Sequence, residues 1–532
     1  MTRRADVVIA GSGFGGAIAA RRLADAYARA GEDPARIVVL ERGEGFAVDS
    51  FEQSMHIDHL SRVYRLIQGQ GMQVVTATGL GGGSNLYLAA SLRAPREVFE
   101  RRDRRPDDGP DRRMWPKAIS RATLDPYYAR AERALRVRRP SWDQVSRSGG
   151  VWAALCDAAG HTCDRVPLAI DLDRCVDAKW CHTGCAFGAK NSLLTNHLAI
   201  ARRRGVTVEP LREVQSVRQS SARPYRYVVT AAVVDAATGR PTGGLEELEC
   251  KVLVLATGAM NDAPILLRSR AALPSLSEHV GRHLGSNGDH LAAVELDPGR
   301  VRDVLGLPGY AEFHEGKPIT TMTYDFWAGR RRDGTRFTLQ EIFLSPLTGI
   351  LYDDGRGPPG DPSWWGLQKK RSLARWSHRI ELLAMVEDTH DGTFLPVPAP
   401  HGGAVRPNGG PVEIGTFTYE LSDQSRAVRA AADAAMRAIA ERSGVGRFLP
   451  MTETEGVYCA HPLGGCRMAD SPDLGVTADD GEVFGYEGLY CSGSSVVPTS
   501  LGVNPSLTIA AVAERIASGL VRRGADLGLP LK

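Results

Sequence analysis

DVVIAGSGFGGAIAARRLADAYARA, residues 6–30, decides the fold of this chain of 532 residues. DVVIA (6–10) is short, mostly apolar and rich in β-branched residues, and a glycine follows it, which predicts a buried parallel strand. GSGFGG (11–16) follows, and the Ala- and Leu-rich segment after it predicts a helix with arginines on its outer face. Residues 37–40 predict a second strand, which ends at Glu41. Strand, helix and strand form a βαβ unit, so we expect an α/β fold with a Rossmann-type domain.

The glycines of this turn predict a dinucleotide site. Gly11 allows the tight turn, Gly13 lets the backbone approach a pyrophosphate, and Gly16 lets helix and strand pack closely. Glu41 can accept hydrogen bonds from ribose hydroxyls, and its charge would repel a 2′-phosphate, which argues against NADP. The motif by itself does not distinguish FAD from NAD, and a purely structural glycine turn is the alternative.

The composition argues against several other classes of protein. A net charge of +3 gives no sign of nucleic-acid binding. No apolar run reaches the roughly 18–20 residues of a membrane span. Arg3-Arg4 resembles the start of an export signal, but the apolar stretch behind it is the nucleotide motif itself, so we expect a mature, cytoplasmic protein. Nine cysteines, an odd number, favour reduced thiols over a disulfide framework.

Two C-terminal stretches carry the candidate reactive residues. They are CAHPLGGCRM (459–468) and GSSVVPTSLGVNPSLTIAAVAER (493–515). A His-Pro-Leu-Gly-Gly-Cys turn, followed downstream by an Asn-Pro pair that leads into an apolar helix, is a poor core pattern. It would suit two polar groups, His461 and Asn504, held against a flavin ring. As alternatives, His461 is a turn histidine satisfied by the backbone, and Asn504 is the N-cap of the helix.

Motifs along most of the chain point to one family. They are GSGFGG (11–16), GLGGGSNL (79–86), WP (115–116), LDPYY (124–128), CHTGCAFGAKNSL (181–193), LATGA (255–259), VGRHLGSNGDH (280–290), HPLGGC (461–466) and GVNPSLTIAAVAER (502–515). Together they resemble the glucose–methanol–choline (GMC) oxidoreductase family, and are most similar to its cholesterol-oxidase-like bacterial branch. Residues 291–450 carry little of this resemblance, and they are where we expect the substrate to be selected.

The resemblance implies noncovalently bound FAD in an elongated site. Gly82 and Gly83 would lie along the flavin, Val214 would meet the adenine end, and Asn504-Pro505 would approach the isoalloxazine. The predicted cofactor-binding set comprises Gly11, Gly13, Phe14, Gly16, Glu41, Gly82, Gly83, Asn85, Val214, Gly493, Pro505 and Ser506.

His461 and Asn504 match the family's catalytic pair, but two nearby positions depart from the cholesterol-oxidase pattern. Gly493-Ser494 stands where Asp-Gly is usual, and YLAA (87–90) replaces Asn-Gly-Gly-Met. The second departure changes the expected shape of the substrate pocket, so a sterol substrate does not follow from the resemblance alone.

The resemblance also predicts two domains. Residues 1–95, 190–290 and 455–532 would form the FAD-binding domain, built mainly on a parallel sheet. Residues 96–189 and 291–454 would form a second α+β substrate domain on an antiparallel sheet, in line with the change in composition after residue 291. The family implies a carboxylate base from this domain. Glu312, Glu341 and Glu387 are candidates, each also explained as a solvated surface charge.

Alcohol oxidation removes a hydroxyl proton and a hydride. The flavin N5 takes the hydride, and an imidazole suits the proton because it titrates near neutral pH. His461 would hydrogen-bond the substrate oxygen and take its proton or stabilise the alkoxide, while Asn504 would orient the substrate and polarise the flavin edge.

We therefore expect an FAD-dependent oxidoreductase that converts a small hydrophobic, cyclic (sterol- or terpenoid-like) alcohol to the ketone, with O₂ or another acceptor reoxidising the flavin. The alternatives are a redox-neutral isomerase, which borrows a hydride and returns it, and a non-catalytic FAD-binding protein. The oligomeric state is left open.

A cysteine cluster offers a competing interpretation as a metal site. Cys175, Cys181, His182 and Cys185 fall close together, and three thiolates with an imidazole can hold zinc. Their spacing is not that of a usual zinc finger or ferredoxin, so we expect thiols that pack a loop and no metal.

Overall fold

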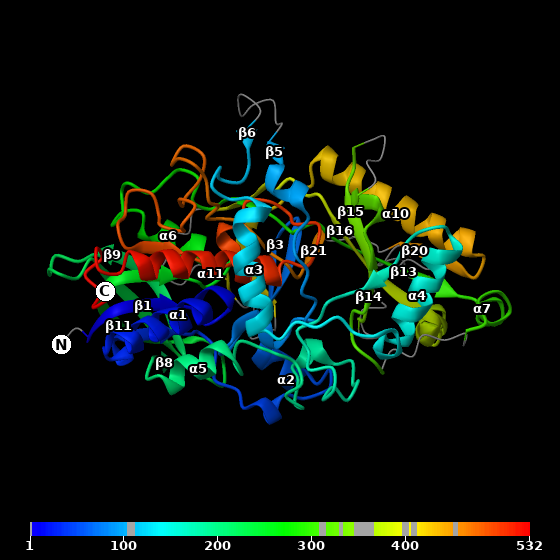
Figure 1. Cartoon of the computed structure of the whole chain (residues 1–532), viewed down its shortest axis with the longest axis horizontal. Coiled ribbons are helices and arrows are strands. Elements are labelled where there is room, and N and C mark those ends of the chain that lie inside the picture. Colours follow the sequence, from blue (N-terminus) through cyan, green and yellow to red (C-terminus); the bar gives the residue numbers. More distant parts are fainter. Residues whose placement is uncertain are drawn as a thin grey trace.

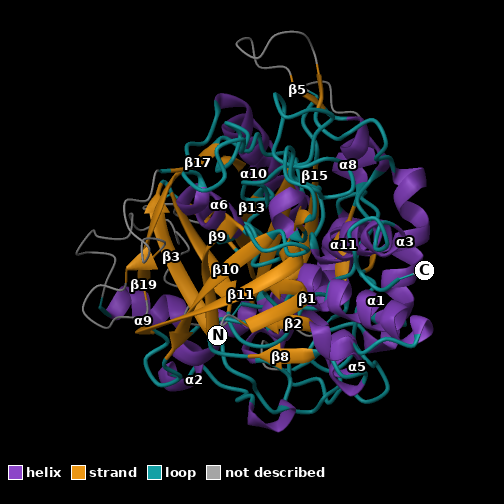
Figure 2. Cartoon of the chain, turned by 90° about the vertical axis from the view of Figure 1, so that its left-hand side faces the viewer, coloured by secondary structure: helices purple, strands orange, loops and turns teal. Residues whose placement is uncertain are grey.

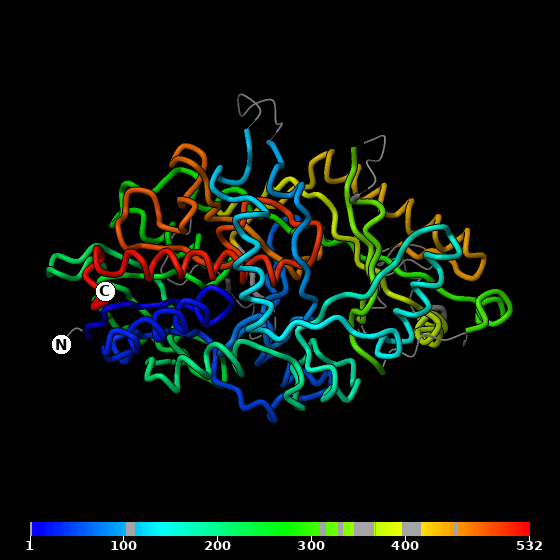
Figure 3. Tube along the Cα trace, viewed as in Figure 1, coloured from blue at the N-terminus to red at the C-terminus, as the bar shows by residue number. Residues whose placement is uncertain are grey.

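The described part of the chain contains three large sheets of six or seven strands in the computed structural model (Figure 1). The structure describes residues 3–103, 112–307, 315–328, 334–344, 366–395, 404–405, 412–450 and 456–531. The first sheet lies at the end of the molecule that holds both termini, the third lies at the opposite end, and the second lies between them (Figures 1 and 3).

The first sheet contains the predicted βαβ unit. β1 (Arg3–Ala10) lies at its centre, parallel to β2 (Ile37–Leu40) and to β11 (Pro241–Leu255). Its apolar residues 7–10 are completely buried, which explains why the strand has no polar alternation. The remaining strands are β8 (Thr207–Glu209), β9 (Arg212–Gln219), β10 (Tyr227–Val234) and β22 (Leu489–Cys491). β8 and β22 pair in parallel and β9 and β10 pair antiparallel, so the predicted Rossmann-type, mainly parallel sheet is confirmed.

Helices from both ends of the chain cover one side of this sheet. α1 (Phe14–Ala30) packs against α11 (Ser506–Arg522) and α5 (His197–Arg203), and α11 packs against α3 (Arg121–Ala134). Figure 2 shows α1, α3 and α11 gathered on one side, with β3 and β19 of the second sheet on the other. The C-terminal segment therefore returns to the N-terminal nucleotide motif.

Two features of the first sheet depart from a simple run of strands. β8 and β9 are separate strands, and Leu211 between them adopts a left-handed conformation (φ 59°). β11 is the longest strand of this sheet and begins, at Pro241, as the hairpin partner of β10.

The third sheet is antiparallel throughout its described pairings, as predicted for the second part of the chain. Its strands, in spatial order, are β20 (Gly446–Pro450), β13 (Asp289–Leu296), β16 (Arg379–Val386), β15 (Phe337–Ile342), β14 (Thr321–Thr323) and β7 (Asp164–Arg165). One face packs against α4 (Arg147–Ala158) and α10 (Asp423–Ser443) in a core of its own. The opposite face carries Leu291, Ile342 and Leu383, which pack in the large core shared with the first sheet.

The second sheet is not predicted by the sequence, because it joins segments far apart along the chain. Its strands are β12 (Arg282–Leu284), β17 (Gly392–Phe394), β18 (Ala404–Val405), β19 (Val412–Thr418), β3 (Tyr64–Gln70), β4 (Met72–Ala77) and β21 (Val457–Cys459). Gly71 makes the tight β3–β4 turn with φ 81°, and a Cβ there would lie 2.0 Å from the Tyr419 carbonyl oxygen. The shorter elements are α2 (Ile57–Val63), α6 (Asp262–Ser269), α7 (Pro298–Leu305), α8 (Asp325–Ala328), α9 (Leu367–Leu373), β5 (Arg102–Asp103) and β6 (Arg112–Arg113).

The division into an FAD domain and a substrate domain at the boundaries given above stays a prediction. Within the described ranges, no helix combines the length and the apolar character needed to cross a bilayer.

Candidate active site

One connected cavity of about 1220 Å³ runs between the first sheet, the β3–β4 hairpin and the third sheet. It joins the N-terminal glycine turn to both C-terminal motifs. Its lining includes these predicted site residues: Gly11, Gly13, Phe14, Glu41, Gly82, Gly83, Val214, His461, Gly493, Asn504, Pro505 and Ser506. Gly16 and Asn85 are the two predicted residues that lie outside the lining.

The glycine turn opens one end of the cavity. A Cβ on Gly13 or Gly83 would meet no atom within 4 Å, so both positions leave free space. A Cβ on Gly16 would lie 1.9 Å from the Gly11 carbonyl oxygen, which explains why Gly16 supports packing and does not face the cavity. α1 begins after Gly13 without a side-chain cap, so its first backbone N–H groups can bind an anion.

Glu41 holds the turn in place. Its Oε2 accepts hydrogen bonds from the Ser12 backbone N (3.0 Å) and hydroxyl (2.7 Å), and its Oε1 accepts from the Gly43 N (2.9 Å). Burial raises the pKa of Glu41, while the bonds from Gly43 and Ser12 act in the opposite direction. The structure thus gives Glu41 a local role that the sequence did not suggest, and its contact with a ribose stays a prediction.

Asn85 and Lys190 organise the second glycine loop from behind. The Asn85 side-chain amide donates to the Leu80 carbonyl (2.7 Å). The buried Lys190 ammonium donates to the Asn85 carbonyl, to the Cys181 carbonyl (2.5 Å) and to the Tyr87 carbonyl (3.2 Å). Burial lowers the pKa of Lys190 to about 8. Asn85 therefore shapes the loop from outside the cavity.

His461 reaches the other end of the cavity and is held by a carboxylate that was not predicted from the sequence. Its Nδ1–H donates to Oδ1 of Asp289 over 2.7 Å, and Oδ2 of Asp289 accepts from the Ala460 N (2.9 Å). Asp289 is 4% exposed. Because a carboxylate only accepts, the proton sits on Nδ1 and Nε2 is left as the acceptor. Asp289 belongs to the VGRHLGSNGDH motif, which was the available signal.

Asn504 lies in the loop before α11 and does not cap it. The helix begins at Ser506, with Pro505 in the cap position and no side-chain cap bond. Asn504 is 5% exposed, and its Oδ1 has no hydrogen-bond partner within the described part of the chain. Such an unsatisfied buried oxygen is costly, and it lies in a residue that lines the cavity. The helix-cap interpretation of Asn504 is therefore wrong.

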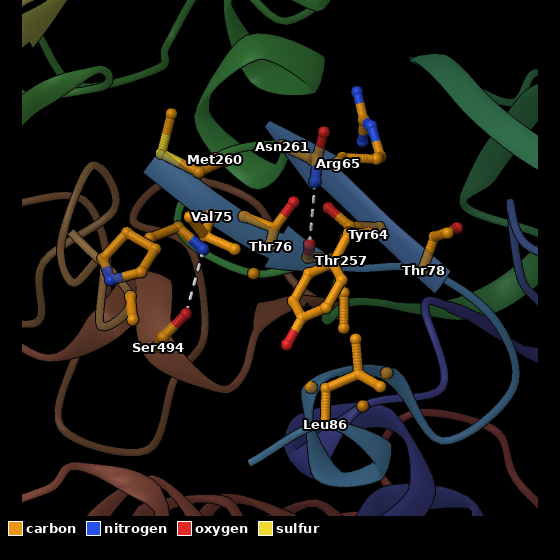
Figure 4. Close-up of a pocket in the computed structure, with 18 of the residues that line it drawn as sticks. Tyr64, Arg65, Val75, Thr76, Thr78, Leu86, Thr257, Met260, Asn261 and Ser494 are labelled. Atoms are coloured by element: carbon orange, nitrogen blue, oxygen red, sulfur yellow. Dashed lines mark hydrogen bonds between the residues drawn. The ribbon is translucent and has the colours of Figure 1, made fainter. Parts of the chain in front are cut away.

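The β3–β4 hairpin forms a polar wall that the sequence did not indicate (Figure 4). Tyr64 projects from β3 toward Leu86, and its hydroxyl donates to the His182 carbonyl. The buried Arg65 and the half-buried Thr76 also line this part of the cavity. Here β4 adds the Thr76 hydroxyl and β3 adds one cationic group, that of Arg65, to the cavity lining.

Polar groups of the 256–262 turn close the side of the cavity next to Ser494 (Figure 4). The Ser494 hydroxyl accepts from the Ala259 N (3.0 Å), and the Asn261 amide donates to the Thr257 carbonyl (3.1 Å). Burial raises the pKa of Asp262, which follows this turn, to about 6. Ser494 thus ties the C-terminal segment to the backbone of the 256–262 turn, 235 residues away along the chain.

The third sheet presents an apolar wall opposite these groups. It comprises Leu291, Ile319, Ile342, Phe343, Leu344 and Leu383. Glu341 does not belong to it, because alternation along β15 places its side chain on the other face, where Oε1 accepts from Ser146 (2.8 Å) and Thr320 (2.6 Å). Burial raises the pKa of Glu341, which is 0% exposed, so its interpretation as a surface charge is wrong. Glu387 does not line the cavity, and Glu312 lies outside the described residues.

The cysteine segment lies behind the cavity wall. Burial raises the pKa of the Cys181 thiol to about 12, and His182, which lines the cavity, stacks on Trp180. Among the described residues, no group of three or more histidine, cysteine or acidic side chains is placed to hold a metal ion.

Comparison with known proteins places this cavity in a family. The N-terminal GMC oxidoreductase family model matches residues 5–287, and the C-terminal GMC oxidoreductase family model matches residues 407–513. The chain belongs to the GMC oxidoreductase family. The resemblance drawn from the sequence motifs is thereby confirmed, and with it the flavoenzyme class.

Two named relatives align with nearly the whole length of this GMC oxidoreductase. It is 26% identical to cholesterol oxidase of Mycobacterium tuberculosis over 96% of its length and 90% of that protein. It is 24% identical to long-chain-alcohol oxidase FAO4B of Arabidopsis thaliana, over 97% of its length and 67% of that protein. The crystal structure of pyridoxine 4-oxidase from Mesorbium loti has the same fold, with a TM-score of 0.64, 15% identity, and coverage of 97% of this chain and 99% of that one.

The cavity of this GMC oxidoreductase fits FAD, the family's cofactor. Open glycine positions at Gly13 and Gly83 leave space beside the uncapped start of α1, as a pyrophosphate requires. The unsatisfied Oδ1 of Asn504 stands at the other end of the same cavity. An elongated cofactor with phosphates at one end and a polar ring system at the other matches both features.

Proposed function

We propose that this GMC oxidoreductase oxidises a hydrophobic, cyclic secondary alcohol of sterol or terpenoid type to the ketone, with O₂ as electron acceptor. Three features support the proposal: the connection between the nucleotide end and His461, the free acceptor nitrogen of His461, and the apolar wall of the third sheet. The first carries the most weight, because a reactive histidine is useful only where a cofactor reaches it.

FAD, when bound, supplies the acceptor for the hydride that leaves the carbinol carbon. His461 binds the substrate hydroxyl through Nε2 and takes its proton. Asn504 orients the substrate by a hydrogen bond that adds no charge. A positioned base of this kind contributes on the order of 10²–10⁴-fold to the rate.

The lining determines which alcohols fit. Leu291, Ile342 and Leu383 come from three neighbouring strands, and they make a broad apolar surface on which a fused ring system can lie. No polyol-binding set of side chains occurs on this wall, within the part of the chain that the structure describes. The names of two relatives, a cholesterol oxidase and a long-chain-alcohol oxidase, agree with a hydrophobic substrate.

Mixing the FAD-loaded protein with matched alcohols without oxygen tests the proposal. A sterol or cyclic terpene alcohol is expected to bleach the flavin absorbance and to yield one ketone per flavin. Admission of O₂ restores the absorbance and yields hydrogen peroxide. A rearranged product with oxidised flavin would identify an isomerase, and faster bleaching by a long-chain primary alcohol or a sugar would overturn the cyclic class.

A further inference from the structure

His461 and Asn504 reach the cavity on two separate segments of the chain. One short turn makes hydrogen bonds to both segments. This is the 286–289 turn, which connects β12 to β13. Asn287 hydrogen-bonds the segment that carries Asn504, and Asp289 hydrogen-bonds the segment that carries His461. The relative placement of the two candidate catalytic groups therefore depends on a third stretch of chain.

The Asp289 arm sets the histidine. Its two carboxylate oxygens are both engaged, one by His461 Nδ1–H (2.7 Å) and one by the backbone N–H of Ala460 (2.9 Å). This pair of contacts fixes the ring and the backbone that carries it. The His461 side chain keeps 22% of its surface exposed and lines the cavity, so the nitrogen opposite Asp289 is the one presented to a substrate.

The Asn287 arm sets the asparagine. Its Oδ1 accepts from the Leu501 N (2.7 Å), and its Nδ2 donates to the Val503 carbonyl (3.0 Å), the residue directly before Asn504. Asn287 is 0% exposed and has φ 56°, a left-handed conformation that asparagine tolerates better than most residues. Since the Oδ1 of Asn504 has no partner among the described residues, its direction follows from the backbone that Asn287 holds.

The turn itself is anchored from below. The Ser286 N and hydroxyl both donate to Oδ2 of Asp388, each over 2.9 Å. Gly288 has φ 75°, and a Cβ there would lie 1.9 Å from the Val386 carbonyl oxygen. The turn thus has no room to slide along β16, and both arms start from a rigid base.

We propose that the 286–289 turn is the positioning element of the active site, with Asp289 and Asn287 as its positioning residues. The inference rests on the proposed roles of His461 and Asn504. During oxidation the hydroxyl proton moves to Nε2 of His461, and Asp289 exchanges no proton. Its ionised carboxylate stabilises the protonated ring and keeps the productive tautomer.

Asp289→Asn is the decisive variant. The carboxylate offers one oxygen to the His461 Nδ1–H and the other to the Ala460 N–H, whereas an amide has a single acceptor oxygen. Either Ala460 loses its acceptor, or the amide NH₂ faces Nδ1 and forces the proton onto Nε2. We expect kcat to fall on the order of 10²–10⁴-fold with little change in KM. The pH profile of kcat is expected to differ from that of the wild type, because the amide places no negative charge beside the ring. The neighbouring Tyr458 and Cys459 do not contribute to this change near neutral pH, because loss of hydration raises the pKa of Tyr458 to about 12 and that of Cys459 well above its usual value.

Asp433→Asn is the matched control. Asp433 also accepts from a histidine over 2.7 Å, Nε2 of His290, but neither residue lines the cavity. We expect its kinetics and pH profile to equal those of the wild type. Equal losses in Asp433→Asn and Asp289→Asn would show a general effect of breaking such pairs and would overturn the proposal.

FAD content and the melting temperature show whether Asp289→Asn is folded. If it folds poorly, two further variants test the inference. Asp289→Glu retains both acceptors and the charge, and is expected to preserve the pH profile while lowering kcat. Asn287→Asp retains the bond to Leu501 but opposes the Val503 carbonyl with an oxygen, and is expected to lower kcat about 10–100-fold with FAD still bound.

Combining Asp289→Asn with His461→Ala separates this inference from the proposed function. If Asp289 acts through His461, the double variant is no slower than His461→Ala alone. Multiplying losses, or an unaltered Asp289→Asn beside an inactive His461→Ala, would overturn the positioning role and leave the proposed function standing. Full activity of His461→Ala would instead overturn the proposed function.

Discussion

The two ends of the cavity are built in different ways. The nucleotide end comes largely from one contiguous stretch, residues 3–41, in which β1, the glycine turn, α1 and β2 follow each other. The reaction end joins His461, Asn504 and the 286–289 turn to the face of the third sheet. The first end is encoded locally and the second by tertiary contacts, so substitutions at the two ends are expected to fail in different ways.

The largest effect is expected at the contiguous end. In Gly16→Val the new Cβ would lie 1.9 Å from the Gly11 carbonyl oxygen, which is a backbone atom and not the end of a flexible side chain. We expect the apoprotein to lose about 3 kcal/mol or more in free energy of unfolding, measured by urea denaturation. Wild-type stability of this variant would mean that α1 does not pack on β1 as described.

Gly13→Val is compared with Gly16→Val, because at Gly13 only the binding of the cofactor, and not the folding of the protein, is expected to be weakened. A Cβ on Gly13 meets no protein atom within 4 Å, and φ is −71°, an ordinary value for any residue. We expect the apoprotein to keep its stability while FAD affinity, measured by fluorescence titration, falls at least about 100-fold. That loss corresponds to about 3 kcal/mol of binding free energy. Unchanged affinity would show that the pyrophosphate lies elsewhere.

Asp388, which accepts hydrogen bonds from Ser286 of the 286–289 turn, is expected to make the stability of the fold depend on pH. Burial alone would raise the pKa of this carboxyl, but the charge of His390 and the hydrogen bonds from Tyr419 and Ser286 outweigh it and lower the pKa to about 2. The folded pKa lies below the unfolded value of 3.8, so ionised Asp388 stabilises the fold above about pH 4, and this stabilisation is lost as pH falls toward 2. Asp388→Asn is expected to cost about 2 kcal/mol at neutral pH.

Urea denaturation along a pH series measures the free energy of unfolding of the wild type and of Asp388→Asn. The difference between the two free energies should become smaller below about pH 4. A difference that stays constant down to about pH 2 would show that the carboxylate charge does not stabilise the turn.

The smallest effect is expected for Ser494→Gly, which removes one hydroxyl from the reaction end. The Ser494 hydroxyl accepts from the Ala259 N over 3.0 Å, a single bond worth about 1 kcal/mol. Steady-state kinetics should show kcat/KM within about tenfold of the wild type. A larger loss would give Ser494 a direct part in the reaction.

The contrast between the two ends also explains what the sequence predicted. The βαβ unit, the mainly parallel first sheet and the antiparallel third sheet followed from local patterns and motif resemblance, and they are confirmed. His461 and Asn504 were predicted from their motifs, and the structure brings both to one cavity. Asp289 and Asn287 were missed because their partners lie more than 170 residues away along the chain.

Other differences have equally physical causes. Glu341 was weighed as a surface charge, since no local pattern reveals that Ser146 and Thr320 cover it. The second sheet went unpredicted because β3 and β4 acquire their outer partners, β19 and β21, from the distant C-terminal part of the chain. The roles of the site residues toward FAD and substrate stay predictions.

The most direct test of the account is the anaerobic bleaching rate of FAD-loaded His461→Ala, measured by stopped flow with a cyclic alcohol that reduces the wild type. We expect a yellow protein that binds FAD as tightly as the wild type and bleaches more slowly, by a factor on the order of 10²–10⁴. Bleaching at the wild-type rate would contradict this expectation, because the histidine at the reaction end would then have no part in the chemistry.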